Sequence, residues 1–415
     1  MVDVTDIVST DLLIVGAGPG GSTAAIYAAR QGLSTLLIDA AEFPRDKTCG
    51  DGLTPRAIHQ LRKLGLADDI LRNYTSHGLK LHGFGGSVTA PWADSAFGPE
   101  GSAMPRTELD NYLVQHAASQ PEVTLWQGAE AGEIQFANGQ IEQVHVRVGE
   151  QERVVKPRVV IVADGVRSTF GKRLGREWHR GEVYGIAARS YCPTPLHDEP
   201  WIHSHLELRD SSGAIQPGYG WIFPLANGRV NLGCGALSTD ERPARINTKK
   251  LLRTYADSMR DEWKLGEPTE VASALLPMGG AVSGVAGPNW MLIGDAAACV
   301  NPLNGEGIDY GMETAELAVE LAATSKDFSL LWPHVLRTQY GDTFQLARTL
   351  ARALTYPQFL PMTGPLGLNT PLLMRSAARL MGNLVTEEDN DIVARLWRTA
   401  GRAVAGRRGD APLWS

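Results

Sequence analysis

A glycine-rich turn between two apolar segments constrains the fold of this chain more than any other feature. Residues 12–15 are apolar and predict a short strand, and the Ala-rich residues 22–31 predict a helix that stops at Gly32. Residues 35–38 predict a second strand, which ends in Asp39. This order of strand, turn, helix, strand and acid is typical of a dinucleotide-binding unit. The turn between the first strand and the helix consists of Gly16, Ala17, Gly18, Pro19, Gly20 and Gly21.

Each part of this unit has a physical role in holding a dinucleotide. Gly16 allows the tight turn, Gly18 lets the backbone approach a pyrophosphate, and Gly21 lets the helix pack closely on the strand. The N-terminal end of the helix offers N–H groups to the phosphates. Asp39 can accept both hydroxyls of the adenosine ribose. The terminal acid argues against a turn that merely connects the strand to the helix. The unit alone does not show whether the dinucleotide is FAD or NAD.

Later motifs favour FAD. Residues 290–293 predict another apolar strand that leads into Asp295, and residues 308–324 predict a helix behind Gly305 and Gly307. In this order the sequence resembles the FAD-dependent reductases and hydroxylases of the p-hydroxybenzoate hydroxylase type. The resemblance implies that Asp295 holds the ribityl chain of FAD. It also implies that the helix N-terminus at Gly305, Gly307 and Ile308 points at the flavin.

Three further positions belong to the same resemblance. Residues 158–163 predict a strand that leads into Asp164, and Arg106 begins a predicted helix where the family places an FAD-contacting arginine. We include Ala129 among the expected FAD contacts. Because these motifs occur in the expected order over some 300 residues, we predict that FAD is the cofactor.

The same order predicts the architecture, an α/β (α+β) fold in which the strands of the FAD lobe are far apart in the sequence. We expect a Rossmann-like FAD-binding lobe from residues 1–78, 101–178 and 276–330. Alternating polarity in residues 79–88 and 202–209 predicts strands of an antiparallel sheet, which we assign to a substrate lobe. That lobe is expected to comprise residues 79–100 and 179–275, and residues 331–415 are expected to form a helical C-terminal region.

Two segments narrow the reaction. Residues 43–53, which contain Cys49, Gly50 and Asp51, resemble the cysteine-containing loop of the geranylgeranyl reductase family. Residues 219–224 match the core of that family's aromatic motif, although Pro217 stands one place closer to Tyr219 than in archaeal members. Nearly the whole chain is similar to actinobacterial members that hydrogenate one isoprene unit of menaquinone. The resemblance implies a menaquinone or related prenyl-lipid substrate and places Cys49, Gly50 and Asp51 beside the flavin.

The expected reaction adds a hydride from reduced FAD to one alkene carbon and a proton to the other. Tyr219, Trp221 and Phe223 alternate along a predicted strand, so their rings share one face that could line the isoprene or pack in an ordinary core. We assign Cys49, Tyr219 and Trp221 as catalytic candidates; Cys49 could equally be a buried structural thiol. Asp51 and Tyr310 are weaker candidates for the proton donor.

One cluster resembles a metal site. His203, His205 and Glu207 share a face of a predicted strand, while Ile202 and Leu206 lie on the other. No further ligand cluster is apparent, so we interpret the polar face as solvated and predict no metal.

Charge and patterning bear on partners and location. The net charge of −7 argues against a nucleic-acid partner. The uncharged runs 271–294 and 353–374 are interrupted by glycines or prolines, so we expect no membrane span. The first six residues do not resemble a secretory signal, and four scattered cysteines suggest reduced thiols. The arginine-rich tail could contact an anionic bilayer or form a lid with a solvated basic face. We expect a cytoplasmic protein, peripherally attached to the inner face of the membrane.

Other functions share the FAD motifs. An FAD-dependent aromatic monooxygenase, a reductase of another polyprenyl lipid, and a prenyl-lipid carrier with a structural flavin all remain open. A flavin halogenase is disfavoured because no Trp-x-Trp-x-Ile element is present. The electron donor is unknown; no second Gly-rich unit is visible, so any NAD(P)H would dock transiently.

Overall fold

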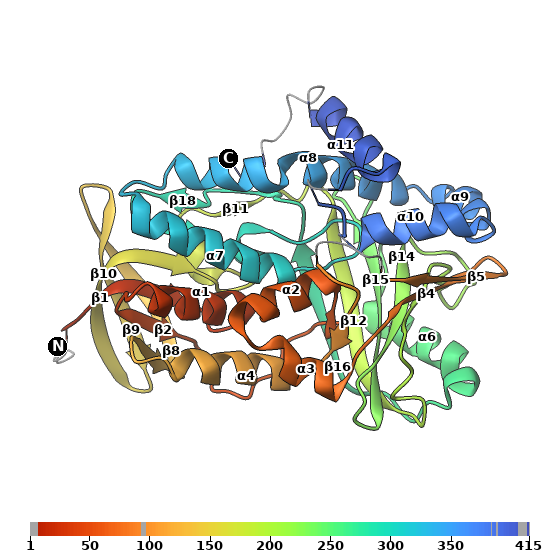
Figure 1. Cartoon of the computed structure of the whole chain (residues 1–415), viewed down its shortest axis with the longest axis horizontal. Coiled ribbons are helices and arrows are strands. Elements are labelled where there is room, and N and C mark those ends of the chain that lie inside the picture. Colours follow the sequence, from red (N-terminus) through yellow and green to blue (C-terminus); the bar gives the residue numbers. More distant parts are fainter. Residues whose placement is uncertain (1–6, 93–96, 383, 387–388, 406–412, 415) are drawn as a thin grey trace.

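The computed structural model describes residues 7–92, 97–382, 384–386, 389–405 and 413–414. The prediction that residues 1–6 are not a secretory signal lies outside these residues, as does part of the predicted tail. Two large sheets lie one after the other along the long axis of the molecule, with helices above and in front of the first (Figure 1).

The first sheet has eight strands and contains the predicted dinucleotide unit. Its central strands are parallel: β1 (Ile7–Val15) pairs with β2 (Thr35–Ile38) and β10 (Gln151–Val162), and β10 pairs with β19 (Trp290–Leu292). The carboxyl half of β1 is buried, as expected for a parallel strand covered on both faces. The remaining strands are β7 (Val123–Trp126), β8 (Ala129–Ala137), β9 (Gln140–Val148) and β18 (Ala286–Gly287).

Helices cover this sheet. α1 (Pro19–Arg30) begins directly after the glycine turn and packs between α4 (Arg106–Ala118) and α7 (Ile308–Thr324) (Figure 1). The predictions of a helix start at Arg106 and of a helix over residues 308–324 are confirmed. The shorter elements are α2 (Pro55–Leu64), α3 (Ala67–Asn73), α5 (Thr169–Arg173), the 3-10 helix η1 (Gly294–Ala297), and the paired short strands β3 (Gly52–Leu53), β6 (Ser102–Ala103), β11 (Glu177–Trp178) and β17 (Val282–Ser283).

The second sheet has seven strands in the order β16-β12-β15-β14-β13-β4-β5. Neighbours are antiparallel except β13 and β4, which pair in parallel; the sheet is therefore mixed at this point rather than wholly antiparallel. Its strands are β4 (Gly78–Gly83), β5 (Gly86–Pro91), β12 (Tyr184–Pro193), β13 (Ile202–His205), β14 (Gly218–Pro224), β15 (Arg229–Ser238) and β16 (Thr269–Pro277).

The prediction of a solvated histidine face was wrong. His203 and His205 are only 6% and 9% exposed, because α6 (Thr248–Trp263) packs over that face of β13. The hydroxyl of Tyr255 lies 2.6 Å from Nδ1 of His205, and the ring of Trp263 meets that of His203 edge-on. Burial lowers the pKa of both imidazoles to about 3, so they are neutral. Alternation separates the faces of a strand but does not reveal what covers them.

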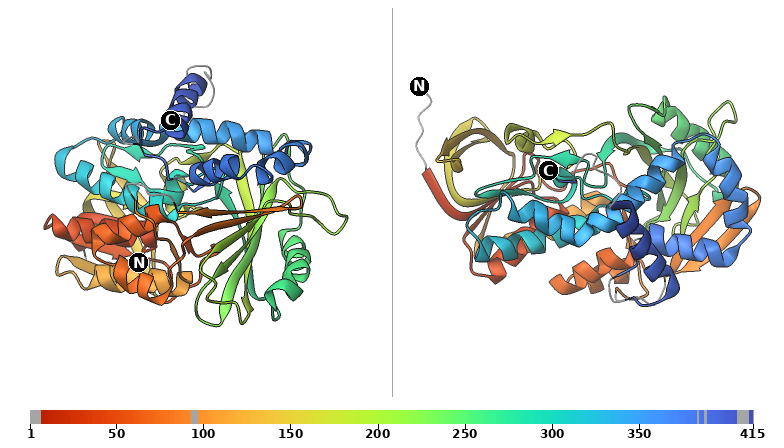
Figure 2. Two further views of the ribbon diagram at one scale, coloured as in Figure 1. Left: turned by 45° about the vertical axis from the view of Figure 1, so that its right-hand side comes forward. Right: turned by 90° about the horizontal axis from the view of Figure 1, so that it is seen from above.

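The C-terminal region is helical, as predicted. It consists of α8 (Leu331–Leu354), α9 (Phe359–Leu368), α10 (Pro371–Met381) and α11 (Ile392–Ala405). Leu368, Met374 and Ala378 form an apolar cluster with β4 and β5, so α9 and α10 cover one end of the second sheet (Figure 2). Among the described residues, no helix is both long and apolar enough to cross a bilayer.

Candidate functional site

The glycine turn closes against the first sheet so tightly that side chains are excluded. Gly16 has φ +102°, and a Cβ there would meet the carbonyl oxygen of Ala163 at 2.4 Å. A Cβ on Gly21 would lie 1.7 Å from the carbonyl oxygen of Gly16. Because non-bonded atoms do not approach this closely, the turn and the start of α1 require glycine at both positions.

Asp39 lies beside this turn, at the end of β2. Its carboxylate accepts hydrogen bonds from the backbone N–H of Ala17, at 2.8 Å, and of Ala41, at 2.9 Å. The N–H of Ala129 donates to the backbone carbonyl of Asp39 at 2.8 Å. The structure therefore brings Asp39 and Ala129 together next to the glycine turn, at the carboxyl edge of the parallel strands, where ligands of such sheets bind.

Two guanidinium groups lie over Gly18. Arg106, at the start of α4, makes a bidentate pair with Asp110 at 2.6 and 2.7 Å, and Arg45 reaches the same carboxylate at 3.0 Å. A Cβ on Gly18 would lie 3.3 Å from a terminal nitrogen of Arg45 and 4.0 Å from one of Arg106. The sequence reasoning missed Arg45, although its position six residues after Asp39 in the loop was a usable signal. Together the two cations suit an anionic pyrophosphate.

Asp164 lies at the same edge but has other partners. Its carboxylate accepts hydrogen bonds from the hydroxyl of Ser168 at 2.6 Å and from the N–H of Phe170 at 2.8 Å. Both partners belong to the start of α5, so this side chain caps that helix. Direct contact of Asp164 with the cofactor stays a prediction.

Asp295 and the start of α7 meet at the end of β19. Asp295 forms a salt bridge with Lys47 at 3.8 Å, and its Oδ1 would lie 3.0 Å from a Cβ on Gly307. Asp295, Gly305, Gly307 and Ile308 all face one cavity, which extends to the second sheet. The late FAD motif and the start of α7 therefore line one cavity.

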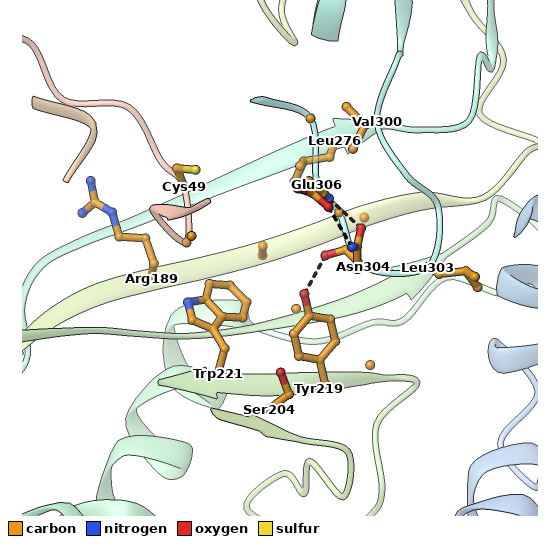
Figure 3. A pocket seen from close by; sticks show the side chains of 18 of the residues that line it. Cys49, Arg189, Ser204, Tyr219, Trp221, Leu276, Val300, Leu303, Asn304 and Glu306 are labelled. Atoms are coloured by element: carbon orange, nitrogen blue, oxygen red, sulfur yellow. Dashed lines mark hydrogen bonds between the residues drawn. The ribbon is translucent and has the colours of Figure 1, made fainter. Parts of the chain in front are cut away.

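This cavity has a volume of about 340 Å³ and lies between the two sheets. Cys49, Gly50, Asp51 and Arg106 contribute to its side nearest the glycine turn. Three small residues of β12 and β15, Gly185, Ala187 and Gly235, leave room for this cavity. The C-terminal region covers it with Leu360, Ala378, Met381 and Gly382. Figure 3 shows Cys49, Trp221, Tyr219 and Glu306 around the same space. The arrangement suits a flat ring beside an apolar chain.

The predicted row of aromatic residues lines this cavity. Tyr219, Trp221 and Phe223 project from one face of β14, with successive ring centroids 5.9 and 6.2 Å apart. The prediction that they share a face is confirmed. Trp221 lies across Gly233, and its Nε1 donates to the side-chain oxygen of Asn231 at 2.9 Å. The row is thus a wall of the cavity held in a fixed orientation.

Asn231, which the sequence reasoning missed, joins this wall to the cysteine loop. Its Nδ2 donates to the carbonyl of Cys49 at 2.9 Å and to the carboxylate of Asp51 at 2.8 Å. The Tyr191 hydroxyl donates to the same carboxylate at 2.7 Å, and Arg189 forms a salt bridge with Asp46. Nothing in the sequence pattern marked this asparagine. The loop is therefore attached to the second sheet at several points.

Burial controls the protonation of two groups in this loop. It raises the pKa of the Cys49 thiol, which the nearby Arg106 guanidinium partly opposes, so Cys49 carries its proton at neutral pH. Burial also raises the pKa of Asp51 to about 6, against its hydrogen bonds from Asn231 and Tyr191. All four cysteines of the chain are free, and three of them are buried.

Comparison with known proteins identifies the family. The model of the FAD binding domain family matches residues 9–328, which span most of both sheets. The chain belongs to this family and binds FAD. The matched region contains the glycine turn, Arg106, Asp295 and the start of α7.

Relatives within the FAD-binding family have more specific names. The chain is 52% identical to a menaquinone reductase of Mycolicibacterium smegmatis over 96% of this chain and 97% of that protein. It is 29% identical to a digeranylgeranylglycerophospholipid reductase of Methanopyrus kandleri over 83% of this chain and 90% of that one. A crystal structure of a geranylgeranyl bacteriochlorophyll reductase-like protein from Thermoplasma acidophilum superposes with a TM-score of 0.77 at 22% identity. It covers 94% of this chain and 99% of that chain, and it shares the fold.

The residues present fit FAD. Gly16 and Gly21 form a turn that any Cβ would fill, two guanidinium groups flank Gly18, and Asp39 lies at the adjacent strand end. Arg106, whose guanidinium lies near Gly18, also lines the cavity, as do Asp295 and the start of α7. The described residues at the edge of the first sheet could therefore hold an adenine dinucleotide.

Proposed function

We propose that this protein is an FAD-dependent reductase that saturates one isoprene double bond in the side chain of menaquinone. The observation that carries the proposal is the single cavity in which the FAD motifs meet the apolar wall of the second sheet. The similarity to menaquinone reductases supports the choice of lipid. In this proposal residues 1–78, 101–178 and 276–330 hold FAD, and residues 79–100 and 179–275 hold the lipid.

When bound and reduced, FAD supplies a hydride. The protein contributes binding and orientation: Tyr219, Trp221 and Phe223 would lie along the isoprene, opposite the start of α7. Their apolar surface excludes water from the site. The proton is therefore transferred to the unactivated alkene and is not lost to solvent. Cys49 would contact the reacting region as a neutral thiol.

An anaerobic experiment tests the reaction and does not depend on the physiological electron donor. Chemically reduced, FAD-loaded protein is mixed with menaquinone, and the lipid is weighed by mass spectrometry. We expect the flavin to reoxidise and the prenyl chain to gain about two mass units. Reduction confined to the quinone ring would contradict the proposal. Oxygen-dependent product would indicate a monooxygenase, and lipid binding without reoxidation would indicate a carrier.

We further propose that α9 and α10 rest on an anionic bilayer, from which the lipid enters. These helices expose Met362, Leu366, Leu372 and Leu373, which we call the α9–α10 apolar surface. The exposed Arg375 lies on the same helix as Leu372 and would face lipid phosphates. Leu360 and Met381 of the same two helices line the cavity. The same two helices thus carry the exposed apolar surface and line the cavity, which supports a membrane as the partner of that surface.

Removing part of this surface should weaken membrane binding. Leu366 and Leu372 are 66% and 79% exposed, so Leu366→Ser with Leu372→Ser should leave the fold intact. We expect at least roughly tenfold weaker binding to phosphatidylglycerol vesicles in a sedimentation assay, because each leucine loses about 1.5–3 kcal/mol of burial. Leu330→Ser is the control, since Leu330 is 82% exposed away from α9 and α10. Equal binding of the double variant and the control would contradict the proposal.

A further inference from the structure

Glu306 is an acid in the cavity with no role assigned so far. It lies between Gly305 and Gly307, immediately before α7, and its side chain is partly open to the cavity. Figure 3 shows Glu306 beside Asn304, which in turn accepts a hydrogen bond from the hydroxyl of Tyr219. Glu306 therefore lies at the place where the start of α7 faces the aromatic wall.

Hydrogen bonds fix the orientation of this carboxyl group. Oε1 accepts a hydrogen bond from the hydroxyl of Thr54, which also caps α2. Oε2 accepts from the side-chain amide of Asn304 at 3.3 Å, and the backbone N–H of Glu306 donates to Asn304 Oδ1 at 2.9 Å. The group is thus positioned by two elements, as a general acid must be.

The surrounding charges favour the neutral form of Glu306. Behind it, the Arg56 guanidinium forms salt bridges with both Asp309 and Glu313. An ionised Glu306 would place a third carboxylate beside one cation, away from bulk water. Tyr219 and Tyr310 also face the group, and both remain protonated because burial raises their pKa values. Burial and the Asp309 charge raise the pKa of Glu306 well above its ordinary value, which the hydrogen bonds from Thr54 and Asn304 and the charge of Arg56 partly oppose.

The other acids of the cavity are less suited to give up a proton there. The Tyr219 hydroxyl donates to the backbone carbonyl of Asn304 at 2.6 Å, so its proton is already engaged. Asp51 also lines the cavity, but its side chain is 0% exposed and its carboxylate is stabilised by hydrogen bonds from Tyr191 and Asn231. Asp295 pairs with Lys47, and burial holds the proton on the Cys49 thiol. Among these acids, Glu306 combines a side chain partly open to the cavity with a fixed carboxyl group that its surroundings keep neutral.

We propose that Glu306 is the proton donor of the alkene reduction. The inference rests on the proposed function. The alkene gains a hydride from reduced FAD at one carbon and the carboxyl proton of Glu306 at the neighbouring carbon. The C=C π bond, the O–H bond of Glu306 and the flavin N–H bond that supplies the hydride break, and two C–H bonds form. Two electrons leave the flavin and none leave Glu306, whose carboxylate is then reprotonated from water.

The test uses Glu306→Gln with Glu316→Gln as the matched control. Glu316 lies on α7 and pairs with Lys63, outside the cavity. With chemically reduced, FAD-loaded proteins and menaquinone under anaerobic conditions, we expect side-chain saturation to slow about 100-fold or more in Glu306→Gln and to stay unchanged in the control. The wild-type rate should fall as pH rises through the raised pKa of Glu306, because the donor must be protonated; this fall should be absent in Glu306→Gln.

A second readout does not depend on activity. The infrared spectrum of the FAD-loaded protein should show a protonated carboxyl band that shifts in D₂O, persists in Glu316→Gln and disappears in Glu306→Gln. If Glu306→Gln fails to hold FAD, Glu306→Asp replaces it and should retain both a slower reaction and its loss at alkaline pH. Wild-type protein that saturates no menaquinone would overturn the proposed function. Saturation at equal rates by wild type and Glu306→Gln, or no such band in wild type, would overturn this inference alone.

Discussion

The substitution Gly21→Ala should strongly weaken the binding of FAD. The added Cβ would lie 1.7 Å from the carbonyl oxygen of Gly16, so either the turn opens or α1 moves away from the sheet. Overpacking typically costs about 1–3 kcal/mol even where neighbours can move. Here the neighbour is backbone, and its displacement disturbs the N–H groups that face the pyrophosphate. We expect FAD affinity to fall at least roughly 10- to 100-fold, measured by flavin fluorescence during titration of apoprotein.

Gly181→Ala provides the control for this substitution. A Cβ at Gly181 meets no atom within 4 Å, and its backbone does not need the left-handed region. The control should bind FAD as wild type does. If both variants bind FAD normally, the close approach of turn and helix does not govern cofactor binding.

Arg56→Met should destabilise the folded protein severely. Arg56 is buried on α2, forms salt bridges with Asp309 and Glu313 of α7, and packs over the ring of Tyr310 at 4.9 Å. Methionine fills much of the volume but leaves two carboxylates without this cation. Removal of one partner of a buried ion pair typically costs about 3–5 kcal/mol. We expect a loss of that size in the free energy of unfolding, measured by urea denaturation of the FAD-loaded protein.

Replacing an exposed arginine of the same helix by methionine shows how much of the stability loss depends on burial of the ion pair and how much on the lost charge alone. Arg62 pairs with Glu100, and both side chains are exposed to more than a third. Arg62→Met should cost less than about 1 kcal/mol, because solvent screens such pairs. Equal losses at Arg56 and Arg62 would show that burial does not set the value of the inner ion pair.

The elements around the glycine turn could be predicted because their signals are local. Strand, turn and helix follow each other within thirty residues. Their residue types match what the backbone needs there: Gly16 adopts a positive φ, and Gly21 leaves no room for a Cβ. The start of α4 at Arg106 and the span of α7 were likewise predicted from local pattern. The aromatic row on β14 followed from a period of two alone.

Features that depend on contacts between distant segments could not be predicted in this way. The burial of His203 and His205 requires α6, which begins more than forty residues later. Asn231 connects β15 to a loop near residue 50, and one asparagine in a strand carries no pattern. The alignment of Glu306 with Thr54 depends on how α2 meets α7. Family resemblance supplied the cofactor and the lipid, which composition and spacing left open.

The order of strands in the first sheet has a consequence for the synthesis of the protein. β1 and β2 leave the ribosome early, but β10 lies between β1 and β19, and α7 ends only at Thr324. At about 5–20 residues per second, roughly 15–60 s separate the glycine turn from the helix that completes its site. Until β10 has been synthesised, the edge of β1 that pairs with it has no partner strand and needs protection from aggregation. We therefore expect a nascent chain to bind FAD only after α7 has been synthesised, and chains that stop before residue 324 to remain without it.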